Sequence, residues 1–197
     1  MVVARAELAS WERLVTPDGT ILRRPTLADV PGVFAVHRDP AVYRHDPQEV
    51  HPDPDHTTRF LTPMVEHWAD HGWGYWVVLV PRAVWPQGEA GTEPCDGDRV
   101  VAGLGGIRLH TLQGRTVLNV LYRFSPATQG RGLAGLVLER ALAVAPLVAP
   151  GVDLVVRTRP ANAAARHVAE RAGFTDVGPE PGATGLWLLT RSAPAPP

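Results

Sequence analysis

Over residues 115–142 a strand leads directly into a glycine-rich turn and then into a helix, which sharply limits the folds open to this chain. The strand RTVLNVLYRF is followed by QGRGLA at residues 129–134 and then by an apolar helical repeat. Gly130 and Gly132 let the backbone bend and approach a ligand without an intervening side chain. The helix start presents unpaired N–H groups and the positive end of the helix dipole, and Arg131 adds a cation. The turn therefore predicts a cradle for a pyrophosphate group.

Two other phosphate-binding motifs share this strand, turn and helix, and the sequence argues against both. A P-loop needs Gly-Lys-Ser/Thr after its spacer, but the chain contains no lysine. A Rossmann motif needs an acid about 20 residues on, at the end of the next strand. Asp153 stands at the beginning of the next apolar segment instead. A turn that binds no ligand stays possible at this point, because an isolated glycine motif is a weak signal.

The remaining elements follow from hydrophobic periodicity and from turn residues. Helices are expected over 26–39, 57–71, 133–146 and 161–172, and strands over 20–24, 75–80, 100–110, 115–124, 152–156 and near 174 and 186–189. Thr26 and Asp29 have the spacing of a capping box, and Pro146 is expected to end its helix. A strand, two helices and then an antiparallel meander indicate an α+β fold rather than a doubly wound one.

Composition excludes several functional classes. The formal net charge is -1 among 197 residues, so the bulk charge favours neither nucleic acid nor an anionic membrane as a partner. The single cysteine, Cys95, cannot form an internal disulfide, which fits a reducing compartment. The N-terminal segment MVVARAELAS lacks the apolar stretch of a signal peptide, and no segment has the length of a membrane span. A cytoplasmic location is expected.

The glycine turn resembles the acetyl-CoA signature of the GNAT superfamily of N-acetyltransferases, Q/R-x-x-G-x-G/A, with Gln129, Gly132 and Ala134 in the defined positions. The V-x-P that often precedes the signature appears as Phe-Ser-Pro at 124–126. Downstream, NAAARHVAERAGF at 162–174 resembles the family's next block. The segment RDPAVYRHDP is similar to the branch that contains the ribosomal-protein alanine N-acetyltransferases.

The resemblance implies a fold and a cosubstrate. The fold would be α+β, with a mixed, mostly antiparallel central sheet of about six to seven strands flanked by helices and splayed between the fourth and fifth strands. Acetyl-CoA would bind as cosubstrate, without a metal. Its pyrophosphate would be held by the backbone amides of the turn, and its thioester carbonyl by the N–H of Phe124. The residues implied in cofactor binding are Phe124, Gln129, Gly130, Arg131, Gly132, Leu133, Ala134, Asn162 and Arg166.

Two of these residues also have simpler interpretations. Asn162 is a good N-cap residue, and capping is compatible with ligand contact. Arg166 stands four residues before Glu170 on the same helix, a spacing typical of a solvated ion pair.

The catalytic residues depart from the family's usual pattern. Many members carry a tyrosine general acid in the last helix, where this chain has Ala169. In the branch named above, an acid often precedes the tyrosine of the fourth strand, and Asn119 stands at that position before Tyr122. Asn119 and Tyr122 are therefore the catalytic candidates, with Asn119 ordering water because an amide cannot act as a base. No base is identified.

The segment 37–56 contains four histidines and several aspartates. Their spacing matches no familiar zinc pattern, so no metal is expected. A substrate-facing loop is the preferred interpretation, because variable loops on a rigid scaffold usually determine specificity. His37, Tyr43 and His45 are the candidate substrate residues.

The sequence thus predicts an N-terminal extension (1–19), a single acetyltransferase domain (20–191) and a proline-rich tail (192–197). The expected activity is direct transfer of acetyl from acetyl-CoA to a primary amine in a ternary complex. The acceptor is a small molecule or a peptide N-terminus, and the protein is a monomer or homodimer. The alternative is a catalytically silent acyl-CoA-binding sensor or partner module.

Overall fold

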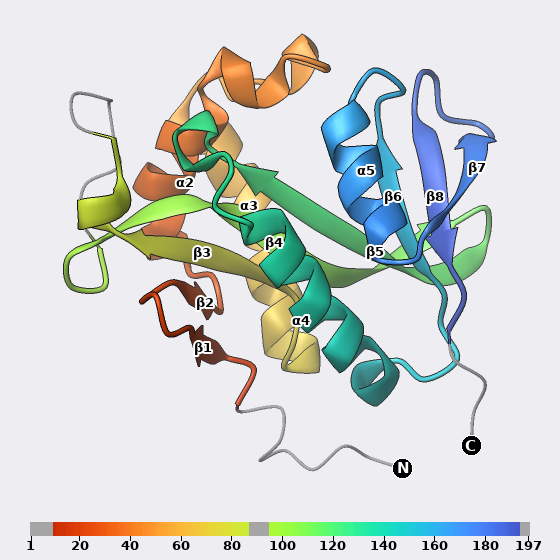
Figure 1. The fold of residues 1–197 in the computed structure, drawn as a ribbon, viewed down its shortest axis with the longest axis horizontal. Helices are drawn as coiled ribbons and strands as arrows, with labels where there is room; N and C mark the ends of the chain where they lie inside the picture. The colour runs from red at the N-terminus through yellow and green to blue at the C-terminus, as the bar shows by residue number, and fades with distance from the viewer. Residues whose placement is uncertain (1–9, 87–94, 194–197) are drawn as a thin grey trace. The chain divides into compact units, whose positions relative to one another are not determined.

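The computed structural model describes residues 10–86 and 95–193, and the chain divides into two compact units (Figure 1). Unit 1 comprises residues up to Gly105 together with Arg123–Leu133. Unit 2 comprises Gly106–Tyr122 and the residues from Ala134 onward. Two long strands, β4 (Arg99–Leu112) and β5 (Arg115–Phe124), contribute residues to both units.

The strands of unit 1 lie side by side in one sheet. In order they are β1 (Arg13–Val15), β2 (Ile21–Arg23), β3 (Tyr75–Pro81) and the first part of β4, and β1, β2 and β3 pair antiparallel. In β3, six of the seven residues are buried, which confirms the buried strand expected from YWVVLV. Its aromatic side chain Trp76 is 1 % exposed.

Two helices of unit 1 pack against each other, α2 (Val30–His37) and α3 (Pro54–His71). A short 3-10 turn, η1 (Leu27–Asp29), precedes α2, and the N–H of Thr26 donates to the Asp29 carboxylate at 2.7 Å. This bond satisfies an N–H group that the helix start would otherwise leave unpaired, and it confirms the predicted capping box.

Helix α3 begins three residues earlier than expected. The Asp53 carboxylate accepts a hydrogen bond from the N–H of His56 at 2.6 Å and caps the helix start. Pro54 occupies the first helical position, where its missing N–H costs nothing. Between α2 and α3 lie two further 3-10 turns, η2 (Pro40–Tyr43) and η3 (Pro47–Glu49).

In unit 2, the second part of β4 is followed by β5, β6 (Leu154–Thr158), β8 (Trp187–Arg191) and β7 (Thr175–Pro179). Strands β5 and β6 are parallel, whereas β8 pairs antiparallel with both β6 and β7. The β5–β6 ladder contains three residue pairs and ends at Val120–Val156. Beyond that point β6 continues to pair with β8 alone. The predicted splay between these two strands is confirmed.

Unit 2 also contains helices α4 (Leu133–Val148) and α5 (Ala163–Arg171), and α5 packs on β6 and β8 (Figure 1). The prediction that Pro146 ends α4 is wrong by two residues. A proline removes one N–H donor, that to the carbonyl four residues back. Because the helix ends within its next turn, it loses only that bond.

Other differences from the expected elements are local. Strand β1 lies inside the predicted extension, because the turn at Thr16–Gly19 closes a short hairpin with β2. The described residues therefore contain eight strands, one more than expected. Strand β6 begins two residues late, because the Val152 N–H is bonded to Ala149 in the turn after α4. Most of the predicted connection 86–98 lies outside the described residues.

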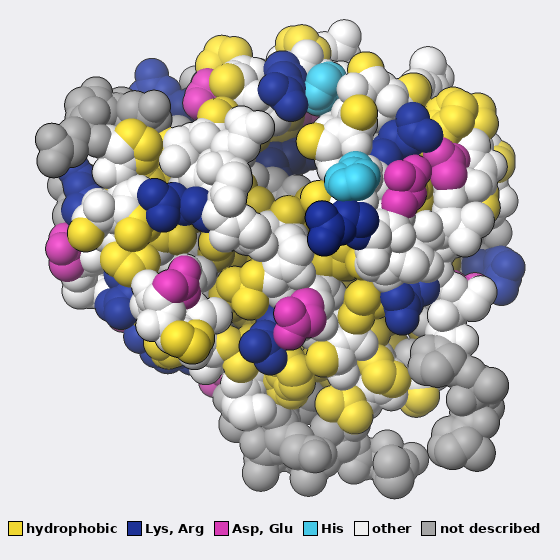
Figure 2. Space-filling view, viewed as in Figure 1, with side chains coloured by type: hydrophobic (Ala, Val, Ile, Leu, Met, Phe, Trp, Pro, Cys, Tyr) yellow, Lys and Arg dark blue, Asp and Glu magenta, His cyan; other side chains and the backbone are white. Residues whose placement is uncertain are grey.

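Charged side chains are dispersed over one face of the molecule. Figure 2 shows arginine and acidic side chains interspersed with apolar ones on the face in view, without a large area of one sign. Within the described residues, no helix is both long and apolar enough to cross a membrane.

Candidate active site

The glycine turn begins directly after β5 and leads into α4. A 3-10 turn, η5 (Pro126–Thr128), is closed by bonds from the N–H groups of Thr128 and Gln129 to the carbonyls of Ser125 and Pro126. Gly130 and Gly132 then adopt left-handed φ angles of 81° and 73°. A Cβ at either glycine would meet nothing within 4 Å. The turn is therefore open, and the first N–H groups of α4 lack helical partners.

Arg131 is anchored beside this turn. Its Nη2 donates to the carbonyl of Val84 at 2.7 Å. The remaining guanidinium donors carry a positive charge next to the glycines, which suits an anionic ligand.

The end of β5 has a defined backbone direction. The Ser125 N–H donates to the Ala102 carbonyl of β4 at 2.8 Å, whereas the Leu118 N–H donates to Asp153 on the opposite edge at 2.8 Å. N–H groups alternate between the two edges of a strand. The N–H of Phe124 therefore points away from β4, along the same edge as that of Leu118.

The two catalytic candidates lie on opposite faces of β5, because side chains alternate along a strand. The Tyr122 hydroxyl donates to the carbonyl of Ala165 in α5 at 2.7 Å, and burial raises the pKa of this phenol far above its usual value. Asn119 pairs in register with Val155, within the part of β5 that is still bonded to β6. Asn119 shares its face of the strand with Arg123.

Asn162 and Arg166 hold the start of α5 and the strands beside it. The Asn162 side chain accepts from the Ala165 N–H at 3.2 Å, so this residue is an N-cap. The Arg166 Nη2 lies 2.7 Å from the carboxylate of Asp176, which also accepts from the indole N–H of Trp187. The ion pair of Arg166 is therefore with β7, not with Glu170.

His37 and Tyr43, both predicted to face the substrate, meet in a buried hydrogen-bonded cluster. The His37 Nδ1 lies 2.6 Å from the Tyr43 hydroxyl, and Nη1 of Arg123 donates to the same hydroxyl at 3.0 Å. The guanidinium carbon of Arg123 lies 4.4 Å from the centre of the Tyr43 ring. His45 is not part of this cluster and accepts a bond from its neighbour Arg44.

The histidines of this cluster are held neutral. Burial, and then the positive charge of Arg123, lowers the pKa of His37 well below its usual value. The ring centre of His51 lies 4.6 Å from that of His37. Burial, then His56 and Arg123, lowers the pKa of His51 to about 4. Neither histidine is a strong base near neutral pH, and within the described residues no group of three or more metal-ligating side chains is found.

Sequence reasoning missed Arg123 as a member of this cluster. Its position in the strand just before Phe124 could be read from the sequence. No sequence pattern, however, connects it with Tyr43, 80 residues away.

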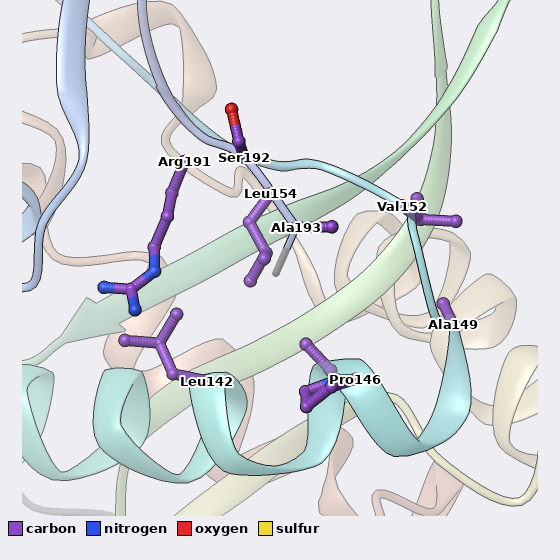
Figure 3. Close-up of a pocket in the computed structure, with 9 residues that line it drawn as sticks. Leu142, Pro146, Ala149, Val152, Leu154, Arg191, Ser192 and Ala193 are labelled. Atoms are coloured by element: carbon purple, nitrogen blue, oxygen red, sulfur yellow. The ribbon is translucent and has the colours of Figure 1, made fainter. Parts of the chain in front are cut away.

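One pocket lies at the other end of α4 from the glycine turn (Figure 3). Its lining comes from the last turns of α4, the start of β6 and the end of β8, and comprises Leu142, Ala145, Pro146, Ala149, Val152, Leu154, Arg191, Ser192 and Ala193. It contains none of the predicted site residues.

Known proteins resemble this chain at the level of family and fold. The sequence profile of the Acetyltransferase (GNAT) domain matches residues 20–175. No curated protein sequence matches the chain.

Several solved structures have the same fold. A GNAT-family acetyltransferase from Bordetella pertussis, described as putative, superposes with a TM-score of 0.65 at 21% identity and covers 91% of this chain and 98% of its own. RimL, a ribosomal L7/L12 α-N-protein acetyltransferase in complex with coenzyme A, gives 0.62 at 15% identity, with coverage of 91% and 97%. YncA from Salmonella typhimurium, with its cofactor acetyl-CoA, gives 0.61 at 18% identity, with coverage of 90% and 95%.

The profile spans more than half of the chain, and the glycine turn at residues 129–134 lies within the matched region. The chain belongs to the GNAT family of acetyltransferases.

Proposed function

We propose that this protein transfers an acetyl group from acetyl-CoA to a primary amine, on a small molecule or a peptide N-terminus, by direct attack in a ternary complex. The observation that carries the proposal is the open glycine turn at the start of α4, with no atom within 4 Å of a Cβ at Gly130 or Gly132. RimL and YncA, which share the fold, were solved with coenzyme A and acetyl-CoA. Residues 20–191 act as one domain in this proposal.

The backbone supplies most of the proposed cofactor contacts. Amides from Gln129 to Ala134 face the pyrophosphate, supported by the dipole of α4 and the charge of Arg131. The N–H of Phe124 is directed away from β4 and donates to the carbonyl oxygen that becomes negative during attack. Since the N–H is fixed by strand geometry, it needs no reorganisation as charge develops.

Proton removal depends chiefly on the acceptor itself. The lowered pKa values of His37 and His51 make both weak proton acceptors, and the raised pKa of the Tyr122 phenol keeps it protonated at neutral pH. The amine therefore binds neutral, and positioning beside the thioester supplies most of the rate. Asn119 is about 16 Å along the strand from Phe124, too far for direct contact with the reacting atoms, and in this proposal it orders a chain of waters that removes the amine proton.

Activity is expected to rise with pH along the acceptor's own ionisation, so that the acidic limb shifts with the acceptor pKa across a series of amines. Asn119→Ala and Tyr122→Phe are each expected to lower kcat by about tenfold to a hundredfold, whereas losing a true general base costs about 10² to 10⁴. The check is a set of pH–rate profiles for amines of graded pKa. An acidic limb that stays fixed while the acceptor changes would reveal an enzyme base.

A second candidate function is a silent acyl-CoA-binding module. The alanine at position 169, fully buried where many family members carry a tyrosine, favours it. Release of free CoA thiol in the presence of an amine separates the two functions. A silent module binds acetyl-CoA without releasing thiol.

A further inference from the structure

We propose that Arg123 binds a carboxylate group of the acceptor, so that the acceptors are small amines of the amino-acid type. This inference rests on the proposed acetyl transfer and specifies its substrate class. It is carried by the position, the contacts and the charge of one side chain.

The Arg123 guanidinium is held in a fixed orientation. The Tyr43 ring lies under the plane of the guanidinium, and the Tyr43 hydroxyl accepts a hydrogen bond from Nη1 of Arg123. Tyr43 is itself 3 % exposed and bonded to the fully buried His37. Because Nη1 is used, the fork formed by Nε and Nη2 is left for another partner, and this fork matches the two oxygens of a carboxylate.

Among the described residues, no carboxylate forms a direct ion pair with Arg123. Two other partly buried arginines are ion-paired with carboxylates, Arg23 with Asp29 and Arg157 with Glu180. Arg123 instead contacts a phenol, and its charge helps to lower the pKa of His37 and His51. Burial raises the pKa of Tyr43, the neighbouring Arg123 lowers it, and the charges of Glu49 and Asp46 raise it to a smaller extent. A partly buried cation of this kind favours an anionic ligand.

The location suits a small acceptor. Arg123 immediately precedes Phe124, whose N–H is the proposed contact of the thioester carbonyl. A carboxylate held on the fork would place an amine a few bonds away beside the same stretch of backbone. An acceptor whose amine and carboxylate are close together, as in an amino acid, satisfies both contacts.

The test compares amino acids with their amides as acceptors, in the wild type and in Arg123→Gln. The wild type is expected to favour each acid in kcat/KM, and Arg123→Gln to reduce the acid-to-amide ratio by about tenfold to a hundredfold through the KM of the acid. The ammonium group of an amino-acid amide has a lower pKa than that of the amino acid. This difference is the same for the wild type and for Arg123→Gln, so it cancels when their acid-to-amide ratios are compared. Turnover of the amide reports whether the variant remains folded.

Arg38 provides a matched control, since it also lies over an aromatic ring of unit 1, that of Phe34, at 5.3 Å. Arg38→Gln should leave the acid-to-amide ratio unchanged. Tyr43→Phe, which keeps the ring but removes the acceptor of Nη1, should lower the ratio partly. If Arg123→Gln lowers kcat/KM equally for acid and amide, or weakens CoA binding in parallel, the proposal is overturned. If neither protein acetylates any amine, the proposed function fails instead.

Discussion

Replacing Gly132 by valine is expected to weaken CoA binding at least about a hundredfold while the chain stays folded. Gly132 has a φ of 73° at the turn that leads into α4, and a Cβ there would project into open space. In the proposed complex that space holds phosphate oxygens, so the valine would exclude the ligand. The left-handed backbone adds a strain of about 1–2 kcal/mol, which a folded domain can absorb. Calorimetric titration with CoA measures the affinity, and circular dichroism measures the fold.

Gly151 is the matched control for this substitution. It has a φ of 75°, it also has no atom within 4 Å of a Cβ, and it lies in the turn after α4. Gly151→Val should therefore show the same backbone strain without a loss of CoA affinity. If Gly132→Val is folded and binds CoA as the wild type does, the pyrophosphate lies elsewhere.

The second large effect is on stability. Gly103→Ala is expected to lower the free energy of unfolding by about 3 kcal/mol, because a Cβ at this position would overlap the carbonyl oxygen of Arg123 and lie 2.8 Å from the Cα of Phe124. These are backbone atoms, so no side-chain rotation relieves the overlap. Strands β4 and β5 would have to separate at the end that carries the proposed thioester contact.

Urea denaturation of Gly103→Ala measures the loss. Gly114→Ala is its control, because Gly114 has a φ of 76° in an open hairpin turn and meets nothing within 4 Å. That variant should lose only about 1 kcal/mol. Equal losses in the two variants would show that the close approach of β4 and β5 has no energetic consequence.

Features that depend on neighbouring residues could be predicted from the sequence. The glycine turn, its position between a strand and a helix, and the capping box at Thr26 and Asp29 are each determined within a few residues. The antiparallel hairpin at Gln113 and Gly114 is of the same kind, with both residues at positive φ. Two ordered motifs then connected these local features to one family.

Features that depend on packing could not be predicted in this way. Strand β1 is three residues long, and it forms because β2 offers an edge for pairing. The contact of Arg123 with Tyr43 joins residues 80 positions apart, and the ion pair of Arg166 with Asp176 crosses from α5 to β7. Sequence spacing favoured a partner within the helix for Arg166, whereas the strand beside it supplied one in better geometry.

Release of CoA thiol from acetyl-CoA tests the central claim most directly. The protein is mixed with acetyl-CoA and a panel of primary amines that includes amino acids and short peptides, and free thiol is followed with a chromogenic disulfide. We expect thiol release that requires both the protein and an amine, is matched mole for mole by acetylated amine, and is lost in Gly132→Val. Binding of acetyl-CoA without thiol release above the protein-free rate, for every amine in the panel, would contradict the account.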